Sequence, residues 1–150
     1  MPGTYTNLLY HIVFSTKKRL PLITEDIEKD LHRYLSGIVR GMKGKMLEIG
    51  GVSDHVHILV KLKPTMALSD VLRELKANSS KWVNEERAKL RKFGWQDGYA
   101  AFTVSESQVP RVKAYIQRQK EHHRRRDFKG ELLALLKRHR VEYDEKYLWD

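Results

Sequence analysis

Hydrophobic and polar residues follow two different periods along this chain, and together they predict a regular order of strands and helices. Four short runs are rich in β-branched, aliphatic or aromatic residues, as strands are; they span residues 8–16, 45–52, 54–62 and 99–105. Two longer stretches, from Thr24 to Gly41 and over residues 68–90, repeat apolar residues at spacings of three and four, which is typical of amphipathic helices. The order strand, helix, strand, strand, helix, strand predicts an α+β fold of the ferredoxin-like βαββαβ type, an antiparallel sheet with both helices on one face.

Two further helices are predicted beyond this core. Ser107 and Pro110 are favourable start signals for a helix that runs to about Arg126, and apolar residues recur at helical spacing over residues 131–140. We therefore expect one domain over residues 1–150. Residues 1–106 would form the ferredoxin-like core, and residues 107–150 a helical extension.

The predicted strand over residues 54–62 carries two histidines one residue apart. Side chains alternate along a strand, so His55 and His57 point to one face while Val56 and Ile58 point to the other. Because the two core helices should cover the apolar face, we expect both imidazoles on the opposite, open face of the sheet. They are candidate metal ligands there. His-x-His also occurs as an ordinary polar pair, so a third ligand must join them to make a metal site.

Charge and composition narrow the function classes. The chain has 29 Lys and Arg against 19 Asp and Glu, a formal charge of +10, which favours a polyanionic partner, with nucleic acid ahead of a membrane surface. It has no cysteine, which excludes disulfides, thiolate ligands and a cysteine nucleophile. No apolar run approaches the roughly 20 residues of a membrane helix, and no signal peptide precedes residue 8, so we expect a cytoplasmic protein. Residues 41–45 lack P-loop spacing, and no nucleotide cofactor is expected.

A second set of candidate residues lies on the predicted helix after residue 107. Tyr115 and Gln119 are four residues apart, which puts them on one helical face, with Arg118 and His122 close to the same line.

Several of these segments resemble one family. The strand with His55-Val56-His57 resembles the His-hydrophobe-His motif of HUH endonucleases, and the segment from Tyr115 to Gln119 resembles the Tyr-Ile-x-x-Gln helix of single-tyrosine HUH transposases of insertion sequences, of the TnpA type. Residues 10–17, 68–82 and 95–99 resemble other segments of these transposases in the same order. The chain lacks the Asn-Pro that usually follows the tyrosine in repeat-associated relatives, and so is similar to the insertion-sequence branch.

The resemblance implies a DNA transposase that binds hairpin ends and cleaves and rejoins single-stranded DNA through a 5′-phosphotyrosine intermediate. Tyr115 would be the nucleophile, and His55, His57 and Gln119 would bind the metal. Two imidazoles and an amide oxygen suit Mg²⁺ or Mn²⁺ better than Zn²⁺. The family also implies a homodimer in which Tyr115 completes the metal site of the partner chain. The six residues expected to contact DNA are Lys17, Arg73, Lys81, Arg118, His122 and Arg124.

Some alternatives stay open. The third ligand could come from His122, His123 or Glu48 instead of Gln119, and we assign the remaining histidines, His11, His32 and His139, to structural or surface roles. The protein could also be a nucleic-acid-binding module without catalysis. It could equally be a metal-dependent single-strand nuclease that uses water and leaves no covalent protein–DNA product.

Overall fold

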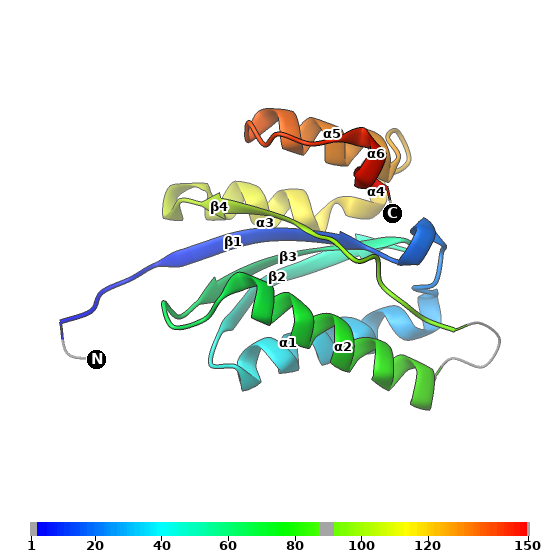
Figure 1. Cartoon of the computed structure of the whole chain (residues 1–150), viewed down its shortest axis with the longest axis horizontal. Coiled ribbons are helices and arrows are strands. Elements are labelled where there is room, and N and C mark those ends of the chain that lie inside the picture. The colour runs from blue at the N-terminus through cyan, green and yellow to red at the C-terminus, as the bar shows by residue number, and fades with distance from the viewer. Residues whose placement is uncertain (1–2, 88–91, 150) are drawn as a thin grey trace.

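The protein is built on a four-stranded antiparallel sheet. The computed structural model describes residues 3–87 and 92–149. The strands β1 (Leu8–Ser15), β2 (Lys45–Val52), β3 (His55–Leu62) and β4 (Ala100–Val104) are arranged in the order β2-β3-β1-β4. The pairs β1–β3, β1–β4 and β2–β3 are all antiparallel. Together with the helices between them, these strands confirm the predicted βαββαβ core (Figure 1).

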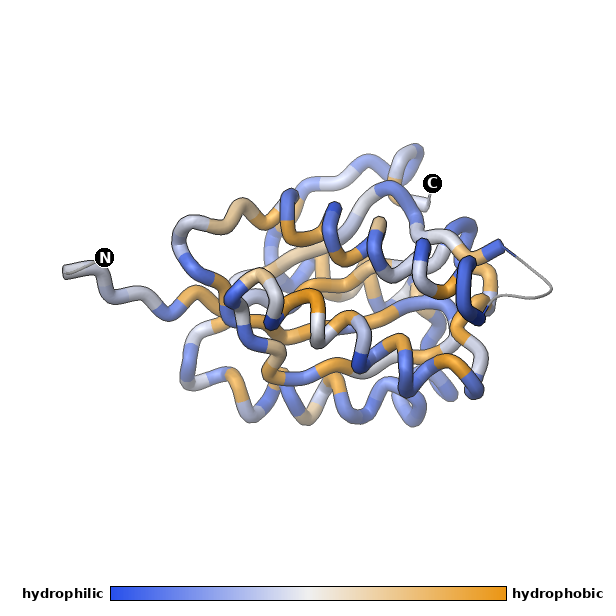
Figure 2. Tube along the Cα trace, turned by 90° about the horizontal axis from the view of Figure 1, so that it is seen from below, coloured by the Kyte–Doolittle hydropathy of each residue, from blue (hydrophilic) through white to orange (hydrophobic). Residues whose placement is uncertain are grey.

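Helices α1 (Glu25–Gly41) and α2 (Leu68–Glu86) cover one face of this sheet (Figure 1). Each helix buries an apolar stripe, and these stripes pack against Val56, Ile58 and Val60 of β3 to form the main core. Figure 2, which views the molecule from this side, shows hydrophilic and hydrophobic residues alternating along both helices. Among the described residues, no helix is both long enough and apolar enough to span a membrane.

The opposite face of the sheet is not open, so that expectation was wrong. The helices α3 (Val109–Gln117), α4 (Gln119–His122), α5 (Phe128–Arg138) and α6 (Glu145–Leu148) lie on this side (Figure 1). Helix α5 has an apolar stripe, which is buried against Val13 and Phe102 of the sheet. A second apolar cluster results, made of Val13, Phe102, Phe128, Leu132, Leu135 and Leu136.

The extension also departs from its predicted helix boundaries. The helix expected to run to Arg126 breaks at Arg118, where α3 ends and α4 begins, and α4 itself ends at His122. The next helix begins earlier than expected, because the Asp127 side chain accepts a hydrogen bond of 2.9 Å from the Gly130 amide and caps the first turn of α5. Glu131 is therefore inside a helix that faces the sheet. Two short 3-10 turns, η1 (Lys17–Arg19) and η2 (Glu106–Gln108), complete the described elements.

Candidate active site

The histidine pair lies on the face of β3 that the extension covers. His55 and His57 share this face, as the strand period predicts, and both are fully buried. Their ring centroids are 5.1 Å apart. The strand thus sets two imidazoles side by side beneath α3 and α5.

Hydrogen bonds at Nδ1 aim both imidazoles toward one point. His55 Nδ1 lies 2.7 Å from the Asp54 carboxylate, and His57 Nδ1 lies 2.8 Å from His11 Nε2. His11 is buried on β1, so its assignment to an ordinary structural or surface role missed its place in the site. Metal-binding histidines commonly have the second ring nitrogen held in this way, which leaves Nε2 free for the ion.

Burial keeps two of these rings neutral. Burial is the main reason that the pKa of His57 falls to about 4 and that of His11 to about 3. Burial also disfavours the charged form of His55, but hydrogen bonds to Asp54 and Glu131 outweigh it and raise the His55 pKa to about 9. Since a metal ligand must present an unprotonated nitrogen, His57 is ready to bind an ion, whereas His55 would release a proton on binding.

Glu131 of α5 is a second residue of the site that sequence reasoning missed. Its side chain is buried, and Oε1 lies 2.9 Å from His57 Nε2, 3.0 Å from His123 Nε2 and 3.2 Å from His55 Nε2. Burial alone would raise the pKa of this carboxyl, but the hydrogen bonds from the surrounding imidazoles outweigh burial and hold it far below its usual range. Glu131 is therefore a carboxylate enclosed by imidazoles. A helix start placed at Asp127 would have been the signal for it.

Tyr115 and Gln119 reach the other oxygen of the same carboxylate. The Tyr115 hydroxyl donates a hydrogen bond to Glu131 Oε2, and Gln119 Nε2 donates to that oxygen at 3.0 Å. Gln119 Oε1 lies 3.1 Å from His55 Nε2. Burial, followed by the negative charge of Glu131, raises the Tyr115 pKa above its ordinary value. The helical face inferred for Tyr115 and Gln119 thus meets the histidine pair.

A glycine allows the tyrosine helix to come this close to the sheet. A Cβ atom at Gly50 of β2 would lie 2.5 Å from the carbonyl oxygen of Ile116 and 3.0 Å from its Cγ2. Ile116 is fully buried and follows Tyr115 directly. The missing side chain at Gly50 therefore sets the height of α3 above the sheet, and with it the position of the Tyr115 hydroxyl.

The donor atoms of the site suit a divalent cation. One ligand atom each from His55, His57, His123 and Glu131 lies within 4.8 Å of the others, and Gln119 Oε1 is adjacent at 3.0 Å from His123 Nε2. His122, ranked ahead of His123 from the sequence, is partly exposed, and its Nε2 is 3.7 Å from Glu131 Oε2.

Glu48, the carboxylate alternative, lies apart from this group, as do His139 and His32, which were assigned to structural or surface roles. Glu48 instead accepts a hydrogen bond of 2.7 Å from Gln117. His139 stacks on Phe102, and His32 lies on α1.

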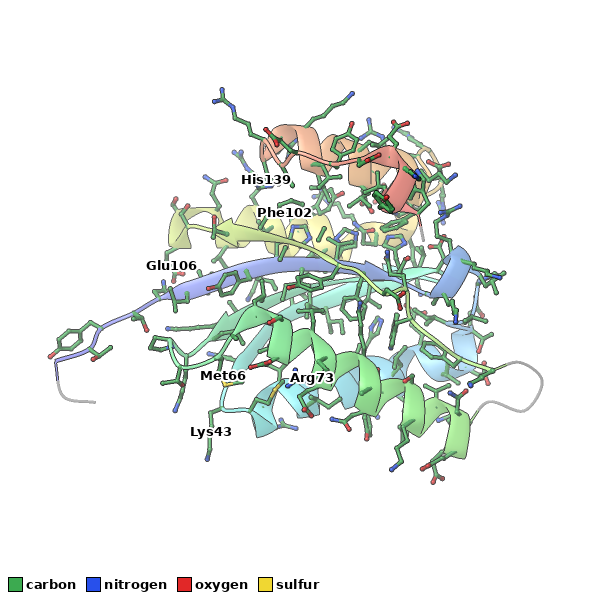
Figure 3. The ribbon with its side chains drawn as sticks, viewed as in Figure 1. Lys43, Met66, Arg73, Phe102, Glu106 and His139 are labelled. Atoms are coloured by element: carbon green, nitrogen blue, oxygen red, sulfur yellow. The ribbon has the colours of Figure 1, made fainter. Side chains whose placement is uncertain are left out.

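The residues expected to contact DNA fall on two sides of the molecule. Arg118, His122 and Arg124 belong to the extension, and the His122 ring is 5.2 Å from the Tyr115 ring. Arg73 and Lys81 are exposed on α2, beyond the other face of the sheet, and Figure 3 shows Arg73 on the side opposite Phe102 and His139. Lys17 is exposed in η1. Arg118, His122 and Arg124 thus belong to the layer that carries Tyr115, whereas Arg73 and Lys81 lie beyond the other face of the sheet.

Known proteins share this sequence pattern and this fold. Residues 4–119 match the family model described as IS200-like transposase. ISDra2 transposase TnpA of Deinococcus radiodurans is 26% identical over 122 residues, 78% of this chain and 87% of the relative. The transposase for insertion sequence element IS200 of Salmonella typhimurium is 29% identical over 138 residues, 88% of this chain and 87% of the relative.

Two solved structures have the same fold. A candidate transposase from Deinococcus radiodurans R1 aligns with a TM-score of 0.63 and 22% identity, over 79% of this chain and 95% of the other. A REP-associated tyrosine transposase bound to a REP hairpin aligns with a TM-score of 0.62 and 13% identity, over 82% of this chain and 73% of the other.

Proposed function

Because this chain belongs to the family of IS200-like transposases, we propose that it cleaves and rejoins single-stranded DNA through a covalent bond between Tyr115 and a 5′ phosphate. The observation that carries the proposal is the meeting of the Tyr115 hydroxyl, the His55 and His57 imidazoles and the Gln119 amide around one buried centre. A nucleophile next to a set of metal ligands is the arrangement that phosphoryl transfer requires.

The transfer exchanges one phosphate ester for another. The Tyr115 oxygen bonds to phosphorus, the bond from phosphorus to the 3′ oxygen breaks, and that oxygen takes a proton to become a free 3′-OH. Glu131 accepts the hydrogen bond of the Tyr115 hydroxyl and is the first acceptor available to its proton. Since the ester bond is conserved in the phosphotyrosine, another 3′-OH can attack it and rejoin the strands without a nucleotide cofactor.

His55, His57 and Gln119 would hold Mg²⁺ or Mn²⁺. A bound divalent ion would neutralise charge on the scissile phosphate and orient it for in-line attack. The chain's own residues prepare this position, because Asp54 and His11 hold the two imidazoles with Nε2 facing the centre.

The substrate is proposed to be single-stranded DNA with hairpin ends. The formal charge of +10 supports a nucleic-acid partner, and Arg118, which follows Tyr115 by three residues, and Arg124 of the extension are exposed. Such residues bind the phosphate backbone without reading its sequence. The REP-associated relative bound to a hairpin supports this choice of substrate.

The test is a covalent-adduct assay. Labelled hairpin DNA with a single-stranded flank is incubated with the protein and Mg²⁺ or Mn²⁺, then resolved under denaturing conditions. We expect a labelled protein–DNA adduct that Tyr115→Phe abolishes while DNA binding is retained, and Tyr5→Phe, at an exposed tyrosine, serves as the matched control. Strand cleavage that persists in Tyr115→Phe would overturn the proposal and favour a nuclease that uses water.

We also propose that two copies associate and that Tyr115 of one completes the site of the other. In the single chain the Tyr115 ring lies 5.6 Å from the ring of its own His57, so exchange of α3 between identical copies would recreate the same contacts. Mixing Tyr115→Phe protein with His57→Ala protein tests the exchange. Adduct formation regained in the mixture supports a site completed in trans, whereas two inactive parents that stay inactive together contradict it.

A further inference from the structure

A single carboxylate oxygen is the meeting point of three imidazoles. Glu131 Oε1 lies between 2.9 and 3.2 Å from Nε2 of His57, His123 and His55. In the absence of an ion, an imidazole Nε2–H donates a hydrogen bond to this oxygen; when an ion binds, the same nitrogen gives up its proton and presents its lone pair to the ion. The second ring nitrogen of His55 and of His57 already has its own partner. The geometry around Oε1 is therefore that of a set of ligands turned toward a shared ion.

These ligands come from two separate layers of the molecule. His55 and His57 belong to β3, whereas His123 follows α4 and Glu131 belongs to α5. Apart from this centre, α5 is held mainly by the small apolar cluster that includes Val13 and Phe102. An ion bound by all four side chains would therefore cross-link the sheet and the extension.

We propose that Glu131 is a further ligand of the metal ion and that ion binding stabilises the packing of α5 on the sheet. This proposal rests on the proposed metal-dependent function. With His123 as the third imidazole of the cluster, the donor set is then three imidazole nitrogens, the Gln119 amide oxygen and one carboxylate oxygen. Because Mg²⁺ prefers oxygen ligands and imidazole suits first-row transition metals, this set binds Mn²⁺ more tightly than Mg²⁺.

The experiment measures Mn²⁺ binding to the full chain by calorimetry and by the loss of the free-ion electron paramagnetic resonance signal. Glu131→Gln keeps the size of the side chain but removes its charge and replaces one accepting oxygen with a donating amide nitrogen. We expect it to weaken Mn²⁺ binding by about tenfold or more, at least the effect of losing an outer partner of a metal ligand. Glu121→Gln, at an exposed acidic residue of α4, is the matched control and should bind as the wild type does. His57→Ala should abolish binding.

Hydrogen exchange of the α5 amides supplies the second readout. Mn²⁺ should slow exchange in Phe128–Arg138 of the wild type and leave Glu131→Gln unchanged. If Glu131→Gln does not fold in the absence of metal, Glu131→Asp replaces it. That variant keeps the charge but withdraws the carboxylate by one methylene, and it should show the same loss of affinity.

The Mn²⁺ affinities of the variants separate the role of Glu131 from the existence of the metal site. If His57→Ala loses Mn²⁺ while the Glu131 variants bind it as the wild type does, Glu131 is not a ligand, and the metal site of the proposed function stands. If His57→Ala also binds normally, the proposed metal site itself is refuted. Equal affinities for Mg²⁺ and Mn²⁺ would contradict the nitrogen-rich ligand set.

Discussion

Replacing Gly50 with alanine tests whether the reaction depends on the close seating of α3 on β2. The added Cβ would lie 2.5 Å from the Ile116 carbonyl oxygen, whereas ordinary van der Waals contact begins at 3.4 Å, a shortfall of 0.9 Å. The obstructing atom belongs to the backbone and cannot rotate away, so α3 must rise from the sheet. Tyr115 is the residue before Ile116 and moves with it.

The expected effect is a slower reaction in a protein that still folds. Overpacking of this kind costs about 1–3 kcal/mol of stability. A displacement near 1 Å of a reacting group lowers the rate on the order of 100-fold. The assay is single-turnover formation of the covalent adduct with labelled hairpin DNA and Mn²⁺, quenched with detergent at timed intervals.

The control for this variant is Gly37→Ala on α1. The nearest heavy atom to its new Cβ is 3.9 Å away, and alanine favours a helix over glycine by about 0.5–1 kcal/mol, so the adduct should form at the wild-type rate. If Gly50→Ala also reacts at the wild-type rate, the contact between α3 and β2 is absent in the reacting protein, and the reasoning from this geometry is refuted.

Three other outcomes are expected. In metal-free protein the pKa of His55 is about 9, against 6.5 in the unfolded chain. Protonated His55 therefore stabilises the fold fully below pH 6.5, and this stabilisation is lost as the pH rises through 9. Thermal melting in the presence of a chelator should show the fall in melting temperature, and Asp54→Asn should make the fall smaller. His11→Asn removes the imidazole that hydrogen-bonds to His57 Nδ1 and orients that ligand, and it should weaken Mn²⁺ binding by about 10–100-fold in calorimetry. An unchanged affinity would show that the hydrogen bond between His11 and His57 does not orient the ligand. Leu35→Ala, at a fully buried position of α1, should lower the free energy of unfolding in urea by about 2–5 kcal/mol, whereas Leu20→Ala, at an exposed position, should change it by less than about 0.5 kcal/mol.

Local patterns were sufficient to predict the core of this fold. Strand and helix periods are set by neighbouring residues, so the βαββαβ order and the face shared by His55 and His57 could be read from the sequence. The helical spacing of Tyr115 and Gln119 also predicted that both side chains would reach the same place, and they do, although the helix breaks at Arg118 between them. Strand and helix periods are properties of single elements, which is why the pattern predicted the elements better than their exact ends.

The composition of the site depended on long-range packing and was only partly predictable. Glu131 joins the histidines because α5 folds back over the sheet, and no local pattern specifies where a helix docks. His123 was among the alternatives for a third ligand, but the sequence could not rank it above His122. His11 was assigned to an ordinary role because its distance from His57 depends on the β1–β3 register. The open sheet face was a wrong prediction for the same reason, since the apolar stripe of α5 had no assigned partner.

Because His55 and His57 are completely buried, the access of DNA to them depends on the fraction of protein molecules that are in an open conformation. A phosphate can reach these imidazoles only in molecules whose helix α5 has lifted while α3 stays seated on the sheet, so the apparent DNA affinity equals the intrinsic affinity multiplied by the fraction of such molecules. If about 1% of molecules are open, the apparent dissociation constant is about 100-fold larger than the intrinsic one. Single-stranded DNA that binds only the open form draws the population toward it. Selectivity for the correct hairpin can then arise from how much binding energy a strand supplies for opening, even if every phosphate is attacked equally well once inside.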